Sequence, residues 1–283
     1  MKQLIVVVLS LILILAFPSQ IQAEGEIPSV IYNILSRKKS DDRARRLIEQ
    51  AMHKEVTIDI VTQETVEKDV KKKAPKKQGD ENSYIKGIDI SKWNGEIDWK
   101  SLKKAGIEFV IIRAGYGTTY VDPYFHKNMQ NAIDNNMIIG VYWFSYAYTE
   151  DMAREEAKKC MSTVNQYKKH IYLPIFYDFE YDSVNYANRR GVRITKDKAS
   201  RFADVFCKTI KQGGYPCGIY TNIDYTNRYF TKEVLSKYHT WIAQWTNSCT
   251  YKNKYILWQC SENYYIKNRR FDLNFFYFNR YNK

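Results

Sequence analysis

The sequence predicts an α/β fold, an irregular TIM-like barrel of five βα units followed by three closing strands. From residue 84 onward, short apolar runs alternate with longer amphipathic runs, a pattern typical of parallel βαβ units. Near the C-terminus, three short apolar runs follow one another with no long helical run between them. An open doubly wound sheet is the alternative fold. No Gly-rich phosphate loop follows the first strand, so no nucleotide cofactor, and no other cofactor, is expected.

Eight apolar runs, rich in β-branched and aromatic residues, are expected to be strands. They are residues 86–91, 109–115, 137–147, 171–180, 217–221, 240–245, 255–260 and 271–276. The helices expected between the first five strands are 97–106, 122–136, 149–167 and 195–214. Pro123 and Thr149 mark helix starts, Asp98 is expected to cap the first helix, and Gly213 and Gly214 end the last.

The N-terminus has the layout of a secretory signal peptide over residues 1–23. Lys2 precedes an apolar run from Leu4 to Phe17, and a polar stretch ends at Ala23. An uncleaved membrane anchor is the alternative. Residues 24–83 contain a charged helical stretch and a Lys-rich run, which predict a flexible linker, and residues 84–283 form the barrel domain. The protein is therefore expected to be secreted, extracellular or cell-wall associated, or tethered to the membrane by its N-terminus.

The chain is basic, with a formal net charge of +13 over 283 residues. After residue 83, 30 Lys and Arg stand against 19 Asp and Glu, so the positive charge is not confined to the linker. Such a surface favours anionic partners, and export disfavours nucleic acid among them. We expect a monomer in which anionic cell-wall polymers contact the basic surface.

Five cysteines lie in the C-terminal two-thirds, at positions 160, 207, 217, 249 and 260. An odd number leaves at least one thiol unpaired. The spacing permits a Cys207–Cys217 and a Cys249–Cys260 disulfide. No Cys and His cluster has the spacing of a zinc site.

Four carboxylates are expected to meet at one end of the barrel. Asp178 and Glu180 lie two residues apart at the end of a buried strand and therefore face the same side. Asp89 lies in the first strand and Asp272 in the last, and these strands become neighbours when the barrel closes. Active sites of such barrels lie at the C-terminal ends of the strands.

Neighbouring carboxylates in apolar surroundings raise one another's pKa, so one of them can stay protonated and act as a general acid. Glycoside cleavage needs such an acid and a second carboxylate that stabilises the cationic sugar. Calcium binding by Asp178, Glu180 and Asp182 is the alternative, although the apolar flanking residues do not resemble a calcium loop. No metal site is expected.

A resemblance to a known family rests on several motifs that occur in order. They are GIDISKWNGEIDW, FVIIRAGYGTTYVDPYFHKNMQNA, IGVYWFSYA, LPIFYDFE, GIYTN, WIAQW and LWQC followed by FDLN. Together they resemble the glycoside hydrolase family 25 lysozymes, the Chalaropsis-type muramidases, over about residues 84–280. The resemblance implies hydrolysis of the β-1,4 bond between N-acetylmuramic acid and N-acetylglucosamine in peptidoglycan glycan strands.

The resemblance also implies roles for the four acids. Glu180 would be the proton donor, and Asp178 would stabilise the developing charge by assisting the acetamido group of the substrate or by direct attack. Asp89 and Asp272 would hold substrate and tune that pair. Candidates for substrate binding are Tyr142, Tyr146, Tyr220, Trp245 and Arg113, although a buried ion pair with one of the four acids is an equal expectation for Arg113.

A non-catalytic glycan-binding barrel is the alternative function. The four filled acidic positions favour the enzyme. The biological role is left open between remodelling of the producer's own wall, passage of a secretion or conjugation apparatus, and lysis of competitors.

Overall fold

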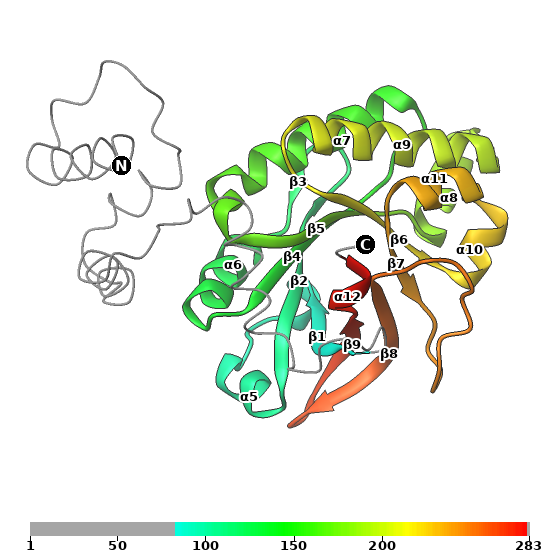
Figure 1. Cartoon of the computed structure of the whole chain (residues 1–283). Coiled ribbons are helices and arrows are strands. Elements are labelled where there is room, and N and C mark those ends of the chain that lie inside the picture. Colours follow the sequence, from blue (N-terminus) through cyan, green and yellow to red (C-terminus); the bar gives the residue numbers. More distant parts are fainter. Residues whose placement is uncertain (1–82, 282–283) are drawn as a thin grey trace, which may run out of the picture. The chain divides into compact units, whose positions relative to one another are not determined.

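The computed structural model describes residues 83–281, so the expected signal peptide and nearly all of the expected linker lie outside the described residues. Nine strands form one sheet (Figure 1). They are β1 (Ile85–Ile90), β2 (Ile107–Tyr116), β3 (Tyr120–Val121), β4 (Ile138–Phe144), β5 (Ile171–Asp178), β6 (Cys217–Asn222), β7 (His239–Ala243), β8 (Leu257–Ile266) and β9 (Arg269–Phe276).

Eight of these strands close into a barrel, as the sequence predicts. The order is β1-β9-β8-β7-β6-β5-β4-β2, and β1 also pairs with β2, while the two-residue β3 adds to the outer edge of β2. Within the ring, β1, β2, β4, β5, β6, β7 and β8 all run in the same direction, and each pairs in parallel with the next. β9 closes the ring between β8 and β1 and runs antiparallel to both. The sequence pattern did not reveal this reversal of the last strand.

The helices of the described chain lie outside the ring of strands, except the C-terminal α12, which lies over one opening of the ring (Figure 1). They are α5 (Trp99–Lys104), α6 (Phe125–Asp134), α7 (Glu150–Val164), α8 (Tyr181–Asn188), α9 (Lys196–Gln212), α10 (Ile223–Arg228), α11 (Lys232–Lys237) and α12 (Phe278–Tyr281). Within residues 83–281, no helix is both long and apolar enough to cross a lipid bilayer.

Helix starts follow the predicted caps. The Asp98 carboxylate accepts from Ser101 N at the start of α5, and the Thr149 hydroxyl accepts from Met152 N at the start of α7. Both confirm the expected N-caps. The short helices α8, α10 and α11 were not predicted.

Alternate residues of each strand point into the barrel, because successive side chains of a strand face opposite sides. The lower layer is an apolar cluster that includes Ile85, Phe109, Ile138, Phe176 and Phe276. The next inward-facing residues along these strands, nearer the other end of the barrel, are polar and acidic. The apolar layer therefore seals the barrel below, and the polar layer faces the mouth.

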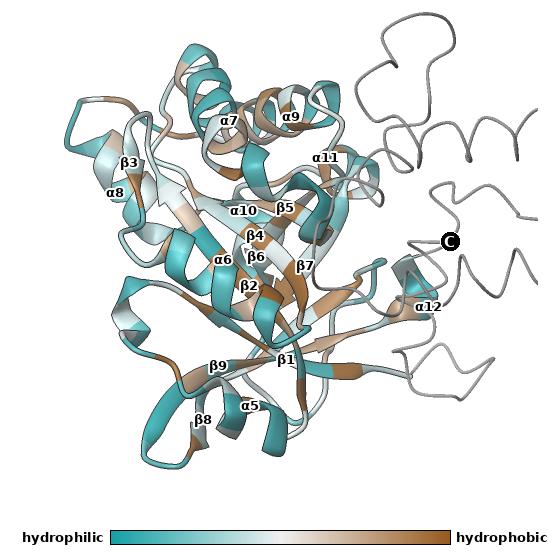
Figure 2. Cartoon of the chain, turned by 90° about the vertical axis from the view of Figure 1, so that its left-hand side faces the viewer, coloured by the Kyte–Doolittle hydropathy of each residue, from teal (hydrophilic) through white to brown (hydrophobic). Residues whose placement is uncertain are grey.

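A second, larger cluster fills the space between the strands and the helices. It includes Val110 and Ile112 of β2, Met129 of α6 and Phe206 of α9, all fully buried. Figure 2 shows hydrophobic colour along the strands and hydrophilic colour on the outer faces of the helices. This amphipathic pattern fixes which face of each helix packs on the barrel.

The β8–β9 hairpin extends beyond the barrel and leans on the segment that follows β1. Lys267 Nζ lies 2.6 Å from the Asp98 carboxylate, and the Arg269 guanidinium donates to the carbonyl oxygens of Asn94 and Glu96. The first and last parts of the described chain are thereby held together.

All five cysteines are free thiols, so neither disulfide suggested by the spacing is present. Cys207 and Cys217 both donate to the carbonyl of Gly218, at 3.7 and 3.8 Å, and the Cys260 thiol donates to Leu273 O at 3.5 Å. Burial raises the pKa of the Cys217 thiol well above its usual value, which keeps it protonated and unreactive.

Candidate active site

Three segments bring the four predicted acids to the barrel mouth. Asp89 lies in β1 and faces Asp272 of β9 in the strand register. Asp178 is the last residue of β5, and Glu180 immediately precedes α8 with an extended backbone. Because β9 runs antiparallel to β1, Asp272 reaches the mouth from the first half of its strand.

Asp89 and Asp272 form one interacting carboxyl pair. Burial raises the pKa of Asp89 to about 6, against the opposing effect of hydrogen bonds from Gln259 and Asn274. The pKa of Asp272 rises to about 8 because of burial and then because of the charge of Asp89. Near neutral pH, Asp272 therefore retains a proton that it can share with the Asp89 carboxylate.

Asp178 and Glu180 form the second pair. Burial raises the pKa of both, and the Glu180 charge raises the pKa of Asp178 further, well above the usual value. Asp178 is only 4% exposed, whereas Glu180 is half-buried. Two carboxylates this close cannot both ionise easily, so the pair keeps one proton near neutral pH, and in the free protein the deeper Asp178 holds it more strongly.

The two pairs lie within electrostatic range of each other. The charge of Glu180 raises the pKa of Asp89, and the charge of Asp272 raises that of Glu180. Tyr220 of β6 faces all four acids, since each of their charges raises the pKa of its phenol. The four predicted acids therefore converge on one site, as the sequence predicts.

Gln259 of β8 organises one side of this site, and sequence reasoning missed it. Its amide nitrogen donates to Asp89 Oδ2 at 2.9 Å, and its oxygen accepts from the Tyr220 hydroxyl at 2.9 Å and from Trp245 Nε1 at 3.1 Å. Asn274 of β9 adds a second donor to Asp89 Oδ2 at 2.7 Å. Both are amides on inward-facing positions of apolar strands, which is the pattern that could have identified them.

The predicted aromatic residues differ in their exposure. Tyr220 is buried and Trp245 is 55% exposed. Tyr142 is half-buried beside Trp241, and Tyr146 is half-buried beside Tyr186, with ring centroids 4.8 Å apart. The exposed face of Trp245 can contact a ligand, whereas the buried Tyr220 donates its hydroxyl hydrogen to Gln259.

Arg113 has a partner that was not predicted. Its Nε donates to Asp122 Oδ2 at 2.8 Å, and both side chains are buried. Arg113 does form a buried ion pair, but the expectation that its partner is one of the four acids was wrong, because Asp122 takes that place. The Arg113 charge still lowers the pKa of Asp178 and that of Tyr142, so it acts on the site electrostatically.

Glu156 of α7 supports the loop that follows β4, although sequence reasoning gave it no role. This fully buried carboxyl accepts from Ser145 Oγ at 2.6 Å and from the Tyr146 backbone at 2.8 Å. Ser145 N in turn donates to the Asp178 carbonyl at 2.7 Å. Burial raises the pKa of Glu156 to about 8, and among residues 83–281 no Lys or Arg forms an ion pair with it.

The calcium alternative finds no support in the described part of the chain. Among residues 83–281, no group of three or more His, Cys, Asp and Glu is arranged to hold a metal ion. The site instead offers a retained proton, an adjacent carboxylate and an exposed indole. This combination suits acid-assisted cleavage of a sugar bond.

Comparison with known proteins agrees with this chemistry. The family model "Glycosyl hydrolases family 25" matches residues 88–269. Lysozyme M1 of Streptomyces globisporus is 43% identical over 65 residues, which is 23% of this chain and 22% of that protein. The aligned segment therefore spans less than a quarter of that curated relative.

Two solved structures share the fold. The modular autolysin LytC of Streptococcus pneumoniae is 27% identical with a TM-score of 0.61, and the match covers 69% of this chain and 47% of that one. A family 25 glycosyl hydrolase of Bacillus anthracis is 26% identical with a TM-score of 0.59, over 68% of this chain and 88% of that one. Since the family model matches well over half of the sequence, the chain belongs to family 25 of the glycosyl hydrolases.

Proposed function

We propose that this protein is a lysozyme, a 1,4-β-N-acetylmuramidase that cleaves peptidoglycan glycan strands outside the cytoplasm. The single observation that carries the proposal is the convergence of four carboxyls in two interacting pairs at the mouth of a family 25 barrel. A lysozyme and a modular autolysin among its relatives, and the structure of LytC in complex with a synthetic peptidoglycan ligand, support the choice of substrate.

Glu180 is the proton donor in this proposal. It is the more exposed carboxyl of its pair, so it is the one that can reach the glycosidic oxygen. It gives its proton to that oxygen as the bond from the oxygen to the anomeric carbon breaks. The departing sugar leaves as an alcohol, and positive charge develops on the sugar that stays.

Asp178 stabilises the charged state. Its Oδ1 atom is buried and has no hydrogen-bond partner among the described residues, so this acceptor is available to a substrate N–H. A hydrogen bond from the substrate acetamido group would favour the ionised form of Asp178 and lower its pKa. The shared proton would then move toward Glu180, where bond cleavage needs it.

The neighbouring groups assist in defined ways. Asp89, fixed by Gln259 and Asn274, holds negative charge near the pair, and Asp272 supplies a second retained proton. The exposed Trp245 and the half-buried Tyr142 and Tyr146 offer ring faces for sugars, and the Arg113 charge tunes Asp178. A water molecule then bonds to the anomeric carbon and gives a proton to Glu180, which restores the carboxyl pair.

The test is release of new reducing ends from purified peptidoglycan by the full-length protein. Glu180→Gln keeps the size of the side chain and removes the proton, so we expect a loss of kcat of roughly 10²- to 10⁴-fold. Asp178→Asn should also lower kcat severely. Products must end in reducing muramic acid.

The control is Glu155→Gln on the exposed face of α7, which removes a carboxyl remote from the mouth and should leave kcat unchanged. Equal rates for wild type and Glu180→Gln would exclude Glu180 as the donor. Tight wall binding without cleavage by the wild type would establish the non-catalytic glycan-binding alternative.

A further inference from the structure

A pocket of about 540 Å³ lies away from the four acids, at the far ends of two short helices. Its lining comes from α8, from the loop and first turn of α9, and from the end of α10. The lining residues are Val184, Asn188, Arg193, Ile194, Thr195, Lys196, Arg228 and Tyr229. None of them belongs to the catalytic set.

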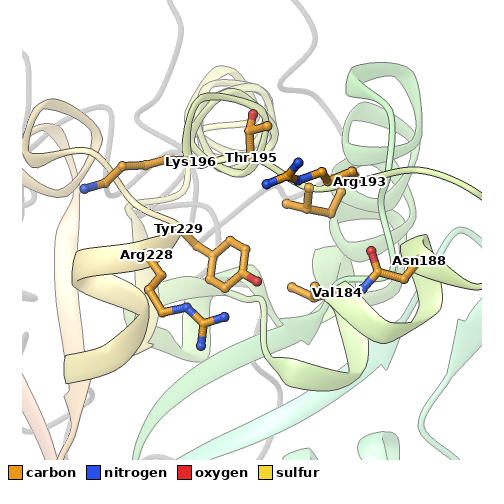
Figure 3. A pocket seen from close by; sticks show the side chains of 8 residues that line it. Val184, Asn188, Arg193, Thr195, Lys196, Arg228 and Tyr229 are labelled. Atoms are coloured by element: carbon orange, nitrogen blue, oxygen red, sulfur yellow. The ribbon is translucent and has the colours of Figure 1, made fainter.

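The rim of the pocket is strongly basic. Figure 3 shows the guanidinium groups of Arg193 and Arg228 directed toward the space around the Tyr229 ring. Lys196 also lines the pocket, but its amino group points outward at the edge. Arg228 pairs with Asp224 at 3.0 Å, but neither Arg193 nor Lys196 has a carboxylate at ion-pair distance among residues 83–281. The pocket therefore carries uncompensated positive charge.

The floor has a different character from the rim. Val184 and Ile194 are buried, and the half-buried ring of Tyr229 lies beside them. Asn188 adds an amide at one side. Cations above an apolar floor fit a small alkyl group that carries a carboxylate, because Arg binds carboxylates through paired hydrogen bonds. A phosphate polymer would instead favour an extended cationic track without an apolar floor.

The pocket lies at a distance from the catalytic centre that a short peptide can span. Glu180 immediately precedes α8, and Asn188 at the other end of this eight-residue helix lines the pocket. Such a helix is roughly 12 Å long. An extended peptide of five residues reaches roughly 16–18 Å.

We infer that this pocket binds the C-terminal carboxylate of the peptide attached to muramic acid in the wall, with the alanyl methyl group on the apolar floor. The inference rests on the proposed muramidase function for its substrate. Such a pocket would make the affinity for substrate depend on the peptide as well as on the glycan. Strands with intact, uncrosslinked peptides would therefore bind better than bare glycan.

The first test is direct binding, which is independent of turnover. Full-length Glu180→Gln protein is titrated with a synthetic wall pentapeptide ending in D-Ala-D-Ala and with its C-terminal amide. We expect the amide to bind at least fivefold more weakly. Arg193→Ala/Lys196→Ala should weaken binding of the acid about tenfold, a loss of roughly 1.4 kcal/mol.

The matched control is Lys100→Ala/Lys104→Ala, which removes two exposed cations from α5 and should leave binding unchanged. Equal binding of acid and amide, or undiminished binding by Arg193→Ala/Lys196→Ala, overturns the inference. Binding of polyglycerol phosphate in place of the pentapeptide, lost in the same double variant, also overturns it and assigns the pocket to a phosphate polymer.

The second test uses glycan strands with and without their peptides, the latter prepared with an amidase. In the active protein, Arg193→Ala/Lys196→Ala should raise KM about tenfold on peptide-bearing strands and leave KM on bare strands unchanged. An equal rise on both substrates contradicts the inference. If no protein cleaves either substrate but pentapeptide binding still depends on Arg193 and Lys196, the muramidase proposal fails and the peptide pocket stands.

Discussion

Glu156 illustrates how a carboxyl that touches no substrate can control the site. Its two oxygens hold Ser145 and the Tyr146 backbone, and Ser145 is bonded to the Asp178 carbonyl. The side chain is fully buried with no described cation to balance a charge, so it is neutral through the neutral pH range. The loop beside Asp178 and Glu180 therefore depends on a protonated acid.

This arrangement makes stability fall as pH rises. The pKa of Glu156 is about 8 in the folded protein, against an ordinary value of 4.5. Between these values the unfolded chain has released a proton that the folded protein keeps. The free energy of unfolding should therefore drop by up to about 1.4 kcal/mol per pH unit, with the full stability present below pH 4.5 and lost through about pH 8.

Glu156→Gln removes the contribution of this residue to the pH dependence, because the amide can hold the same loop without ionising, while the four acids at the mouth keep their own contributions. We expect the Tm of the variant to exceed that of wild type by a margin that grows from pH 5 to pH 8.5, as measured by thermal unfolding. Glu155→Gln, next to it but exposed, should show no such trend. A constant difference at all pH values would mean that Glu156 ionises normally.

The site residues that were predicted are those for which the neighbouring sequence defines which side of a strand the side chain faces. Asp178 and Glu180 lie two apart on an extended segment, so their shared face follows from strand geometry. Gln259 and Asn274 were within recognised motifs, but nothing local shows that their amides meet Asp89 across 170 and 185 residues. The choice of Asp122 as partner of Arg113 likewise depends on the turn between β2 and α6.

At the scale of elements, β1 and β2 lie close enough that a glycine is required. A Cβ at Gly87 would be 2.4 Å from the ring of Phe109, which fills the barrel interior. Gly87→Ala should lower the free energy of unfolding by roughly 1–3 kcal/mol through overpacking, as measured by denaturant titration.

The cause of that loss can be tested with a second substitution. Phe109→Leu shortens the clashing side chain, so Gly87→Ala/Phe109→Leu should be more stable than the sum of the two single changes predicts. If the stability losses of the two single variants simply add in the double variant, the loss in Gly87→Ala is not caused by contact with the Phe109 ring.

The two longest helices were predictable, and so was the six-residue α5 after its Asp98 cap, but three other short helices were not. α7 and α9 are 15 and 17 residues long and begin at Thr caps. α8, α10 and α11 have only six to eight residues, too few to show a helical repeat. The antiparallel direction of β9 comes from its hairpin with β8, since an apolar run does not state its direction.

At the scale of the whole molecule, the net charge of +13 predicts electrostatic attachment to the anionic cell wall. Retention of full-length Glu180→Gln protein on purified walls should fall severalfold between 50 and 500 mM salt, because salt screens exposed charges. Sedimentation with the walls measures it. Walls stripped of anionic polymers serve as the control and should show weaker, less salt-dependent retention. Identical retention on both walls at every salt concentration would rule out this attachment.

The closure of the barrel also has a consequence for how the protein matures. Asp89 emerges early in synthesis, but its partners on β8 and β9 follow 170 to 185 residues later. Contacts of such high sequence separation form late, because a long loop must close before they contribute. A chain without β8 and β9 lacks Asp272 and the two amides that hold Asp89, so it cannot assemble the four carboxyls. Under the proposed function, activity would therefore appear only when the final strand enters the ring.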